Sequence, residues 1–231
     1  NLNSQERFIL AKEMPKGGEL HYHLSGGAYP ETMLQYTDKI CLNEKDFKLF
    51  CEENLDKKFR VFCDMDGVLT DFDAGFKKLN SEGLGPKEYE QEHGKNKIWP
   101  LISDQGSLFW SNLEWMSDGK ELWNHLQQYD PTILSSPSRD YTSITGKMTW
   151  INSNLGITQR KPTTRYKDWD KDTRIILSTH KHLYVIPDTE CILIDDTSSK
   201  IEKWEAAGGI GILHTSAQDT INQLSTILKA Y

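Results

Sequence analysis

The chain has 231 residues, of which 37% are hydrophobic and 26% are charged, and its formal net charge is −7. This composition is typical of an ordinary soluble protein with enough length for a hydrophobic core. The acidic balance argues against binding to a nucleic-acid polymer, which favours a basic excess. No apolar run approaches the ~20 residues of a membrane span, and no signal-peptide pattern opens the chain. We therefore expect a cytoplasmic protein with no membrane partner.

The four cysteines show no metal-binding or redox spacing. They are Cys41, Cys51, Cys63 and Cys191. Cys63 and Cys191 fall within apolar segments, where a free thiol packs as a small hydrophobic side chain. We therefore expect reduced cysteines, as in a reducing compartment.

Residues 1–56 are predicted to form an appendage separate from the rest of the chain. Within residues 15–40, the run Gly-Gly-Glu-Leu-His21-Tyr-His23 resembles the first strand of the adenosine deaminase family, in which a His-x-His pair binds zinc. Alternate residues of a strand share one face, so the two histidines form half of a metal site. The rest of that family's barrel, typically ~250 residues, has no counterpart here. Residues 44–56 are expected to form a helix that leads into the next domain.

A buried strand followed by an acidic turn opens the second domain. Apolar and aromatic residues precede Asp64 and Asp66, and Gly67 allows the backbone to bend sharply after them. An EF-hand calcium loop is excluded, because its glycine and glutamate positions fall on Leu69 and Gly75. In an open α/β sheet, ligands bind at the carboxyl ends of the strands. The acidic pair therefore marks a candidate site.

The segment at about 72–117 is predicted to be a helical cap. Helices are expected at 73–79 and 86–93, and an amphipathic helix at 118–129 returns to the core. The cap contains four large aromatic side chains: Trp99, Phe109, Trp110 and Trp115. These side chains either form the hydrophobic core of the cap or provide an aromatic slot for a nucleobase.

Residues 131–231 alternate between strand and helix patterns. Strands are expected at 131–135, 174–178, 191–195 and 210–214. Helices are expected at 143–154, 198–207 and 217–229. This alternation predicts an α/β domain, residues 57–231, with a parallel sheet covered by helices. The basic loop at 157–173 is either a solvated surface or the border of a phosphate site.

Polar motifs end three of the expected strands. They are Asp64-Met-Asp66-Gly67-Val-Leu-Thr70, Ser135-Ser136-Pro137 and Asp195-Asp196. Their order resembles that of the haloacid dehalogenase-type phosphohydrolases. The resemblance implies a Rossmann-like parallel sheet with a helical cap inserted after strand 1.

The acidic residues fit the hydrolysis of a phosphate monoester, which needs a nucleophile, a cation and a proton donor. Asp64 is the expected nucleophile, which forms an aspartyl-phosphate, and it is also a metal ligand. Asp66 is the expected general acid and base, and the resemblance adds its backbone carbonyl to the metal site. Asp195 and Asp196 complete a Mg²⁺ site, with the directly bound member of the pair left open.

Hydroxyl and ammonium groups are expected to bind the phosphate. Ser135 and the backbone N–H groups at Ser136 lie at a strand end. Lys147 and Lys181 are both candidates for the family's third-motif lysine. Lys181 is favoured, with Lys147 as a second phosphate contact or a surface residue.

Within this superfamily, residues 58–215 are most similar to the 5′(3′)-deoxyribonucleotidases and related phage-type nucleotidases. That similarity carries the base-stacking positions over to Phe72, Phe109 and Trp110. The sequence departs from the family pattern by a serine at position 135, where threonine is more usual. The segment between Lys181 and Asp195 is also longer than expected.

The predicted substrate is a small phosphate monoester, most simply a nucleotide. Two other functions remain open at this point. The protein is either a phosphatase of another small metabolite, such as a sugar phosphate, or a binding module whose phosphatase fold serves as a scaffold. Clustered carboxylates argue against the scaffold, because they repel one another and a scaffold does not need them. The oligomeric state is not predicted.

Overall fold

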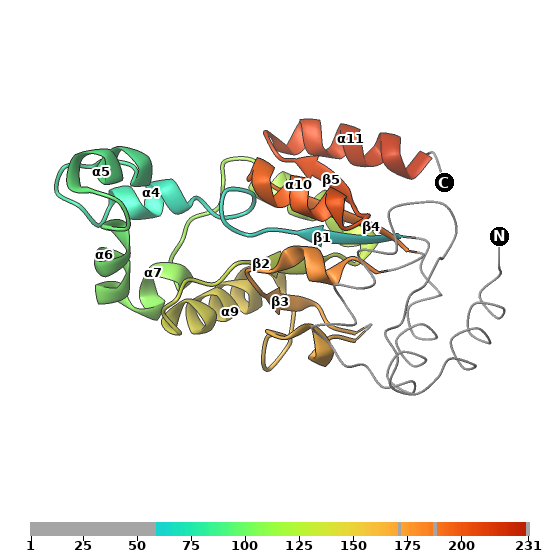
Figure 1. Ribbon diagram of the computed structural model, residues 1–231, viewed down its shortest axis with the longest axis horizontal. Coiled ribbons are helices and arrows are strands. Elements are labelled where there is room, and N and C mark those ends of the chain that lie inside the picture. Colours follow the sequence, from blue (N-terminus) through green and yellow to red (C-terminus); the bar gives the residue numbers. More distant parts are fainter. Residues whose placement is uncertain (1–58, 171, 187–188, 230–231) are drawn as a thin grey trace, which may run out of the picture.

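The structure, a computed structural model, describes residues 59–170, 172–186 and 189–229 (Figure 1). The predictions for the 1–56 appendage therefore lie outside the described residues. These are the deaminase-like segment at 15–40 with His21 and His23, and the helix at 44–56.

A five-stranded parallel sheet with the order β3-β2-β1-β4-β5 forms the centre of the fold. Its strands are β1 (Phe59–Cys63), β2 (Thr132–Ser135), β3 (Ile175–Leu177), β4 (Glu190–Asp195) and β5 (Ile210–Leu213). Strand β1 directly precedes Asp64 as expected, and the other four lie within about a residue of their expected ranges, because each is an apolar run that ends in polar residues. The α/β Rossmann-like fold predicted from the sequence is confirmed.

Both faces of the sheet are buried, each by its own cluster of side chains. Val61 lies in one cluster and its neighbour Phe62 in the other, since alternate residues of a strand point to opposite faces. The flanking helices are α8 (Gly119–Leu126), α9 (Thr142–Leu155), α10 (Ser198–Ala206) and α11 (Ala217–Lys229). Buried residues of α8, α9 and α11 belong to the cluster of Val61, whereas α10 supplies Ile201 and Trp204 to the cluster of Phe62. Among the described residues, no helix is long and apolar enough to cross a membrane.

Four helices between β1 and β2 form the cap. They are α4 (Phe72–Lys77), α5 (Pro86–His93), α6 (Ile98–Gln105) and α7 (Ser107–Ser111). Figure 1 shows α4, α5 and α6 grouped beyond the end at which β1 leaves the sheet. The cap therefore covers the edge of the sheet at which the polar motifs lie.

The basic loop at 157–173 is more than a solvated surface. It contains a short 3₁₀ helix, η2 (Tyr166–Asp168), and the side chains of Tyr166 and Trp169 are buried. Trp169 lies 6.4 Å from Phe62, measured between ring centroids. Of the two interpretations left open for this loop, a solvated surface does not describe its aromatic residues, which help to cover one face of the sheet.

The cap is fixed to the core where α7 packs against α9. A Cβ atom at Gly146 would lie 2.4 Å from the backbone oxygen of Ser107 and 2.5 Å from Cβ of Trp110. We expect Gly146→Ala to lower the free energy of unfolding by about 1–3 kcal/mol through overpacking. Helix propensity alone favours alanine over glycine by about 1 kcal/mol. A lower free energy of unfolding in Gly146→Ala would therefore be due to the steric clash.

Urea denaturation measures this change. Ser153→Ala, on an exposed position of the same helix, is the matched control and is expected to change little. A Gly146→Ala protein as stable as the unaltered protein would show that α7 does not pack this closely on α9.

Candidate active site

The three central strands bring the predicted catalytic residues together. Asp64 directly follows β1, Ser135 ends β2 and Asp195 ends β4. Because β1 lies between β2 and β4, the carboxyl ends of these strands meet at one edge of the sheet. The site therefore forms where the strand-end motifs predict it.

The turn after β1 holds its two carboxylates through local hydrogen bonds. The backbone N–H of Met65 donates to Oδ1 of Asp64 at 2.7 Å, and the Thr70 hydroxyl donates to Oδ1 of Asp66 at 3.1 Å. Gly67 has a φ of 77°, which favours glycine. A Cβ atom at position 67 would lie only 2.2 Å from Oδ2 of Asp196, so the turn packs directly against the second acidic pair.

The two candidate lysines contact different carboxylates. Lys181 begins the 3₁₀ helix η3 (Lys181–Tyr184). Its Nζ lies 2.8 Å from Oδ2 of Asp64 and 2.6 Å from Oδ2 of Asp195. Lys147, on α9, donates to the Ser135 hydroxyl at 2.8 Å and forms an ion pair with Asp66. Both lysines are almost completely buried, so Lys147 is not a surface residue.

A third lysine, Lys200, which was not predicted from the sequence, also contacts the carboxylates of the site. Lys200 lies in the first turn of α10, and its Nζ is 3.3 Å from Oδ2 of Asp64. The signal available in the sequence was its place in the helix that directly follows the Asp195-Asp196 pair. Whether that turn points its side chain into the site depends on how α10 packs on the sheet, which sequence alone does not give.

The cations keep Asp64 ionised despite its burial. Burial raises the pKa of the Asp64 carboxyl, but the ammonium groups of Lys181, Lys200 and Lys147 outweigh it and hold that pKa well below its usual range. Burial, together with the charge of Asp64, raises the pKa of the Asp195 carboxyl. The lysines therefore favour the ionised form of Asp64 despite its burial.

The acidic residues of the site fit a hard divalent cation. Ligand atoms of Asp64, Asp195 and Asp196 all lie within 4.8 Å of one another. Asp195 is fully buried whereas Asp196 is exposed. Carboxylate oxygens in this number suit Mg²⁺, which keeps several waters and prefers oxygen ligands. The side chain of Asp66 instead contacts Lys147 and Thr70.

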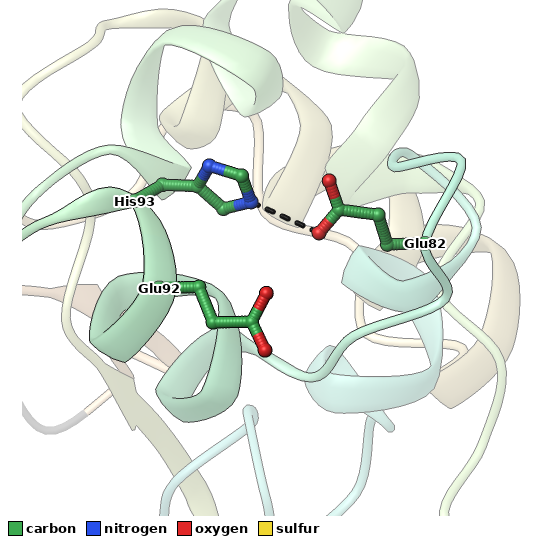
Figure 2. A group of neighbouring side chains, drawn as sticks. All are labelled: Glu82, Glu92 and His93. Atoms are coloured by element: carbon green, nitrogen blue, oxygen red, sulfur yellow. Dashed lines mark hydrogen bonds and ion pairs between the residues drawn. The ribbon is translucent and has the colours of Figure 1, made fainter.

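A second group of potential ligands lies on the cap, away from these residues. It consists of Glu82, Glu92 and His93, all exposed (Figure 2). Nε2 of His93 lies 2.9 Å from Oε2 of Glu82. This contact accounts for the position of the histidine without a metal.

A cavity of about 1080 Å³ extends from the carboxylates into the cap. At the sheet edge it is lined by Asp66, Ser136 and Asp196, and at the cap by Phe72, Trp99 and Trp110, among others. Asp71, Asp73, Asn96, Ser103, Arg139 and Asp140 add polar groups to its wall. The cavity is large enough for a small organic phosphate.

The three predicted base-stacking residues do not all face this cavity. Phe72 and Trp110 line it, but Phe109 does not and is only 7% exposed. The Phe109 ring packs edge-on against the rings of Phe72 and Trp110, with centroid distances of 5.5 Å and 5.1 Å. It therefore stabilises the positions of both rings. Nζ of Lys147 lies 5.0 Å from the centre of the Trp110 ring. Trp99, which is 39% exposed, is the remaining aromatic side chain in the cavity wall.

Comparisons with known proteins find similar solved structures only. No protein-family model and no curated protein match the chain. A hydrolase from Streptococcus pneumoniae TIGR4 shares 13% identity with a TM-score of 0.43, and the match covers 74% of this chain and 99% of that one. A HAD-superfamily hydrolase from Ehrlichia chaffeensis shares 14% identity with a TM-score of 0.41 over 74% and 98%. A HAD-family hydrolase from Deinococcus radiodurans R1 with bound phosphate and sodium shares 12% identity with a TM-score of 0.41 over 76% and 97%.

Because these identities and scores are low, strand order and motif position carry the assignment of the fold. The five parallel strands, the helical cap after β1 and the strand-end motifs in their order all match the pattern predicted from the sequence. The structure therefore has the α/β Rossmann-like parallel sheet that the resemblance to the haloacid dehalogenase-type phosphohydrolases implies.

Proposed function

We propose that the protein is a Mg²⁺-dependent phosphomonoesterase that works through an aspartyl-phosphate on Asp64. The observation that carries the proposal is the Asp64 carboxylate, which is buried yet held ionised by lysines, one of which, Lys200, lines the large cavity. A buried anion surrounded by cations is suited to attack a dianionic phosphate, because the lysines offset the repulsion between them. Asp64, Asp195 and Asp196 would hold Mg²⁺, which neutralises phosphate charge when bound.

In the first step, an oxygen of Asp64 forms a bond to phosphorus while the bond between phosphorus and the ester oxygen breaks. Asp66, as the general acid, gives a proton to the departing oxygen. In this proposal, phosphate oxygens are bound by the Ser135 hydroxyl, the Ser136 backbone and the Lys147 ammonium. Lys181 lies against Asp64 and keeps the attacking carboxylate ionised and in position.

In the second step, water attacks the phosphorus of the aspartyl-phosphate and the bond to the Asp64 oxygen breaks. The Asp66 carboxylate takes a proton from that water, which returns Asp66 to its starting form. Inorganic phosphate leaves and the Asp64 carboxylate is restored. Lys147 and Thr70, which contact Asp66, orient its carboxylate for both proton transfers.

The cavity wall supports a nucleoside monophosphate as the substrate. Phe72 and Trp99, beside the almost completely buried Trp110, supply aromatic surface at the cap, and every nucleobase has a flat face that stacks on such rings. A specific observation also supports a second candidate, a sugar phosphate. Several carboxylate, amide and hydroxyl groups line the same wall and suit a polyhydroxyl compound: Asp71, Asp73, Asn96, Ser103 and Asp140.

A phosphate-release panel with and without Mg²⁺ tests the proposal. It contains 5′- and 3′-nucleoside monophosphates in ribo and deoxy forms, several sugar phosphates and an aryl phosphate. We expect Mg²⁺-dependent release with a preference for nucleotides. A preference for sugar phosphates would select the second candidate, and release from the aryl phosphate alone would remove the base-stacking slot. No release from any compound by protein that binds Mg²⁺ would contradict the phosphatase and favour a binding module.

A further inference from the structure

Lys200 contacts the carboxylates on which the proposed metal site depends. Its Nζ lies 3.3 Å from Oδ2 of Asp64 and 3.8 Å from Oδ1 of Asp195. Both aspartates belong to the group whose oxygens lie close enough to share a cation. An ammonium in this place and a divalent cation are therefore attracted to the same two carboxylates.

The two lysines at these carboxylates differ in burial. The side chain of Lys181 is 3% exposed, whereas that of Lys200 is 31% exposed and forms part of the cavity wall. Moving the Lys181 ammonium away would leave a charge buried without its partners, which is strongly unfavourable. The Lys200 side chain can instead swing from the carboxylates into the cavity, where water or a phosphate can solvate or pair with its ammonium.

The Oδ1 atoms of the two aspartates also accept hydrogen bonds from the backbone. Oδ1 of Asp64 accepts from the N–H of Met65 at 2.7 Å, and Oδ1 of Asp195 accepts from the N–H of Thr197 at 2.9 Å. A divalent cation that binds the Oδ2 atoms of Asp64 and Asp195 consequently shares each of them with at least one lysine. A lysine ammonium and a divalent cation that contact the same carboxylate repel each other, and this repulsion is strong where water is largely excluded.

We infer that Lys200 competes with the divalent cation for Asp64 and Asp195 and so lowers the affinity of the site for metal. This inference rests on the proposed metal site. Lys200 thereby stabilises the carboxylate cluster without metal and makes metal binding depend on displacement of its ammonium.

Metal titration of Lys200→Met tests this inference without any measurement of activity. Methionine keeps most of the side-chain length and removes the charge. Binding of Mg²⁺, and of Mn²⁺ as a second probe, is measured by calorimetry in buffer free of phosphate, so that a role of Lys200 in phosphate binding has no influence. We expect the Kd of Lys200→Met for both ions to fall roughly tenfold or more. The matched control is Lys203→Met, which removes the same charge from an exposed position on the same helix. Its Kd for both ions is expected to be unchanged.

Thermal unfolding supplies the second readout. In EDTA, Lys200→Met is expected to melt at a lower temperature than the unaltered protein. Saturating Mg²⁺ is expected to raise the Tm of Lys200→Met by more than it raises the Tm of the unaltered protein. An unchanged or higher Kd for Lys200→Met, or an equal fall in Lys203→Met, would overturn the inference while leaving the metal site in place. Failure of every variant to bind either ion would instead overturn the proposed metal site, and the inference with it.

Discussion

Replacing Asp64 with asparagine is expected to lower phosphate release by about 10⁴-fold or more, because an amide cannot serve as the nucleophile. The shape of the side chain is almost unchanged, so the cavity keeps its size. The exchange also removes one of two neighbouring buried negative charges, since Asp195 lies against the same lysine. The fold is therefore expected to survive, and circular dichroism with a thermal melt verifies it.

Asp104→Asn provides the matched control for this experiment. Asp104 is exposed on α6 and does not line the cavity. The same chemical change at that position is expected to leave phosphate release unchanged. Folded Asp64→Asn protein that retains more than a small fraction of the activity would rule out an aspartyl-phosphate on this residue.

Lys181→Met is expected to damage both stability and activity. Its ammonium contacts two buried carboxylates, and breaking a buried ion pair by removing one partner lowers the free energy of unfolding by about 3–5 kcal/mol. Lys200 still contacts both aspartates, so we expect a loss near the lower value, about 3 kcal/mol. Phosphate release at a temperature at which the protein is folded is expected to fall by about 10²-fold or more, because a positive charge next to the reacting groups is lost.

Urea denaturation measures the loss of stability, with the exposed Lys95→Met as the control. A double variant identifies the physical cause. If Lys181→Met is unstable because it leaves two carboxylates facing each other, adding Asp64→Asn should restore part of the lost stability. A double variant less stable than Lys181→Met alone would attribute the loss to packing instead of charge.

The sequence predicted the sheet well because its signals are local. Each strand is a short apolar run bounded by polar residues, and the motif that ends it lies at the sheet edge whatever the packing of the helices. Helix α5 begins at Pro86, as proline at a first helical position predicts. The same reasoning placed Asp64, Ser135 and Asp195 at one edge before any coordinate was known.

The parts of the site that depend on helix packing were harder to predict. Both candidate lysines proved to lie in the site, but only the structure shows that Lys181 contacts Asp64 whereas Lys147 contacts Asp66. Lys200 was missed because the direction of a side chain in the first turn of a helix depends on how that helix docks. Phe109 and Trp110 are neighbours in sequence, yet only Trp110 lines the cavity, because adjacent positions of a helix point in different directions.

The strand order has a consequence for the way the chain is synthesised. Strand β1 comes first among the described strands but lies in the centre of the sheet, and its partner β4 pairs Phe59 with Glu190. During translation, β1 can pair with β2 and β3 while its other edge stays open until β4 leaves the ribosome. An open, apolar strand edge is prone to pair with other chains. The arrival of β4 closes this edge and brings Asp195 to Asp64 in the same event.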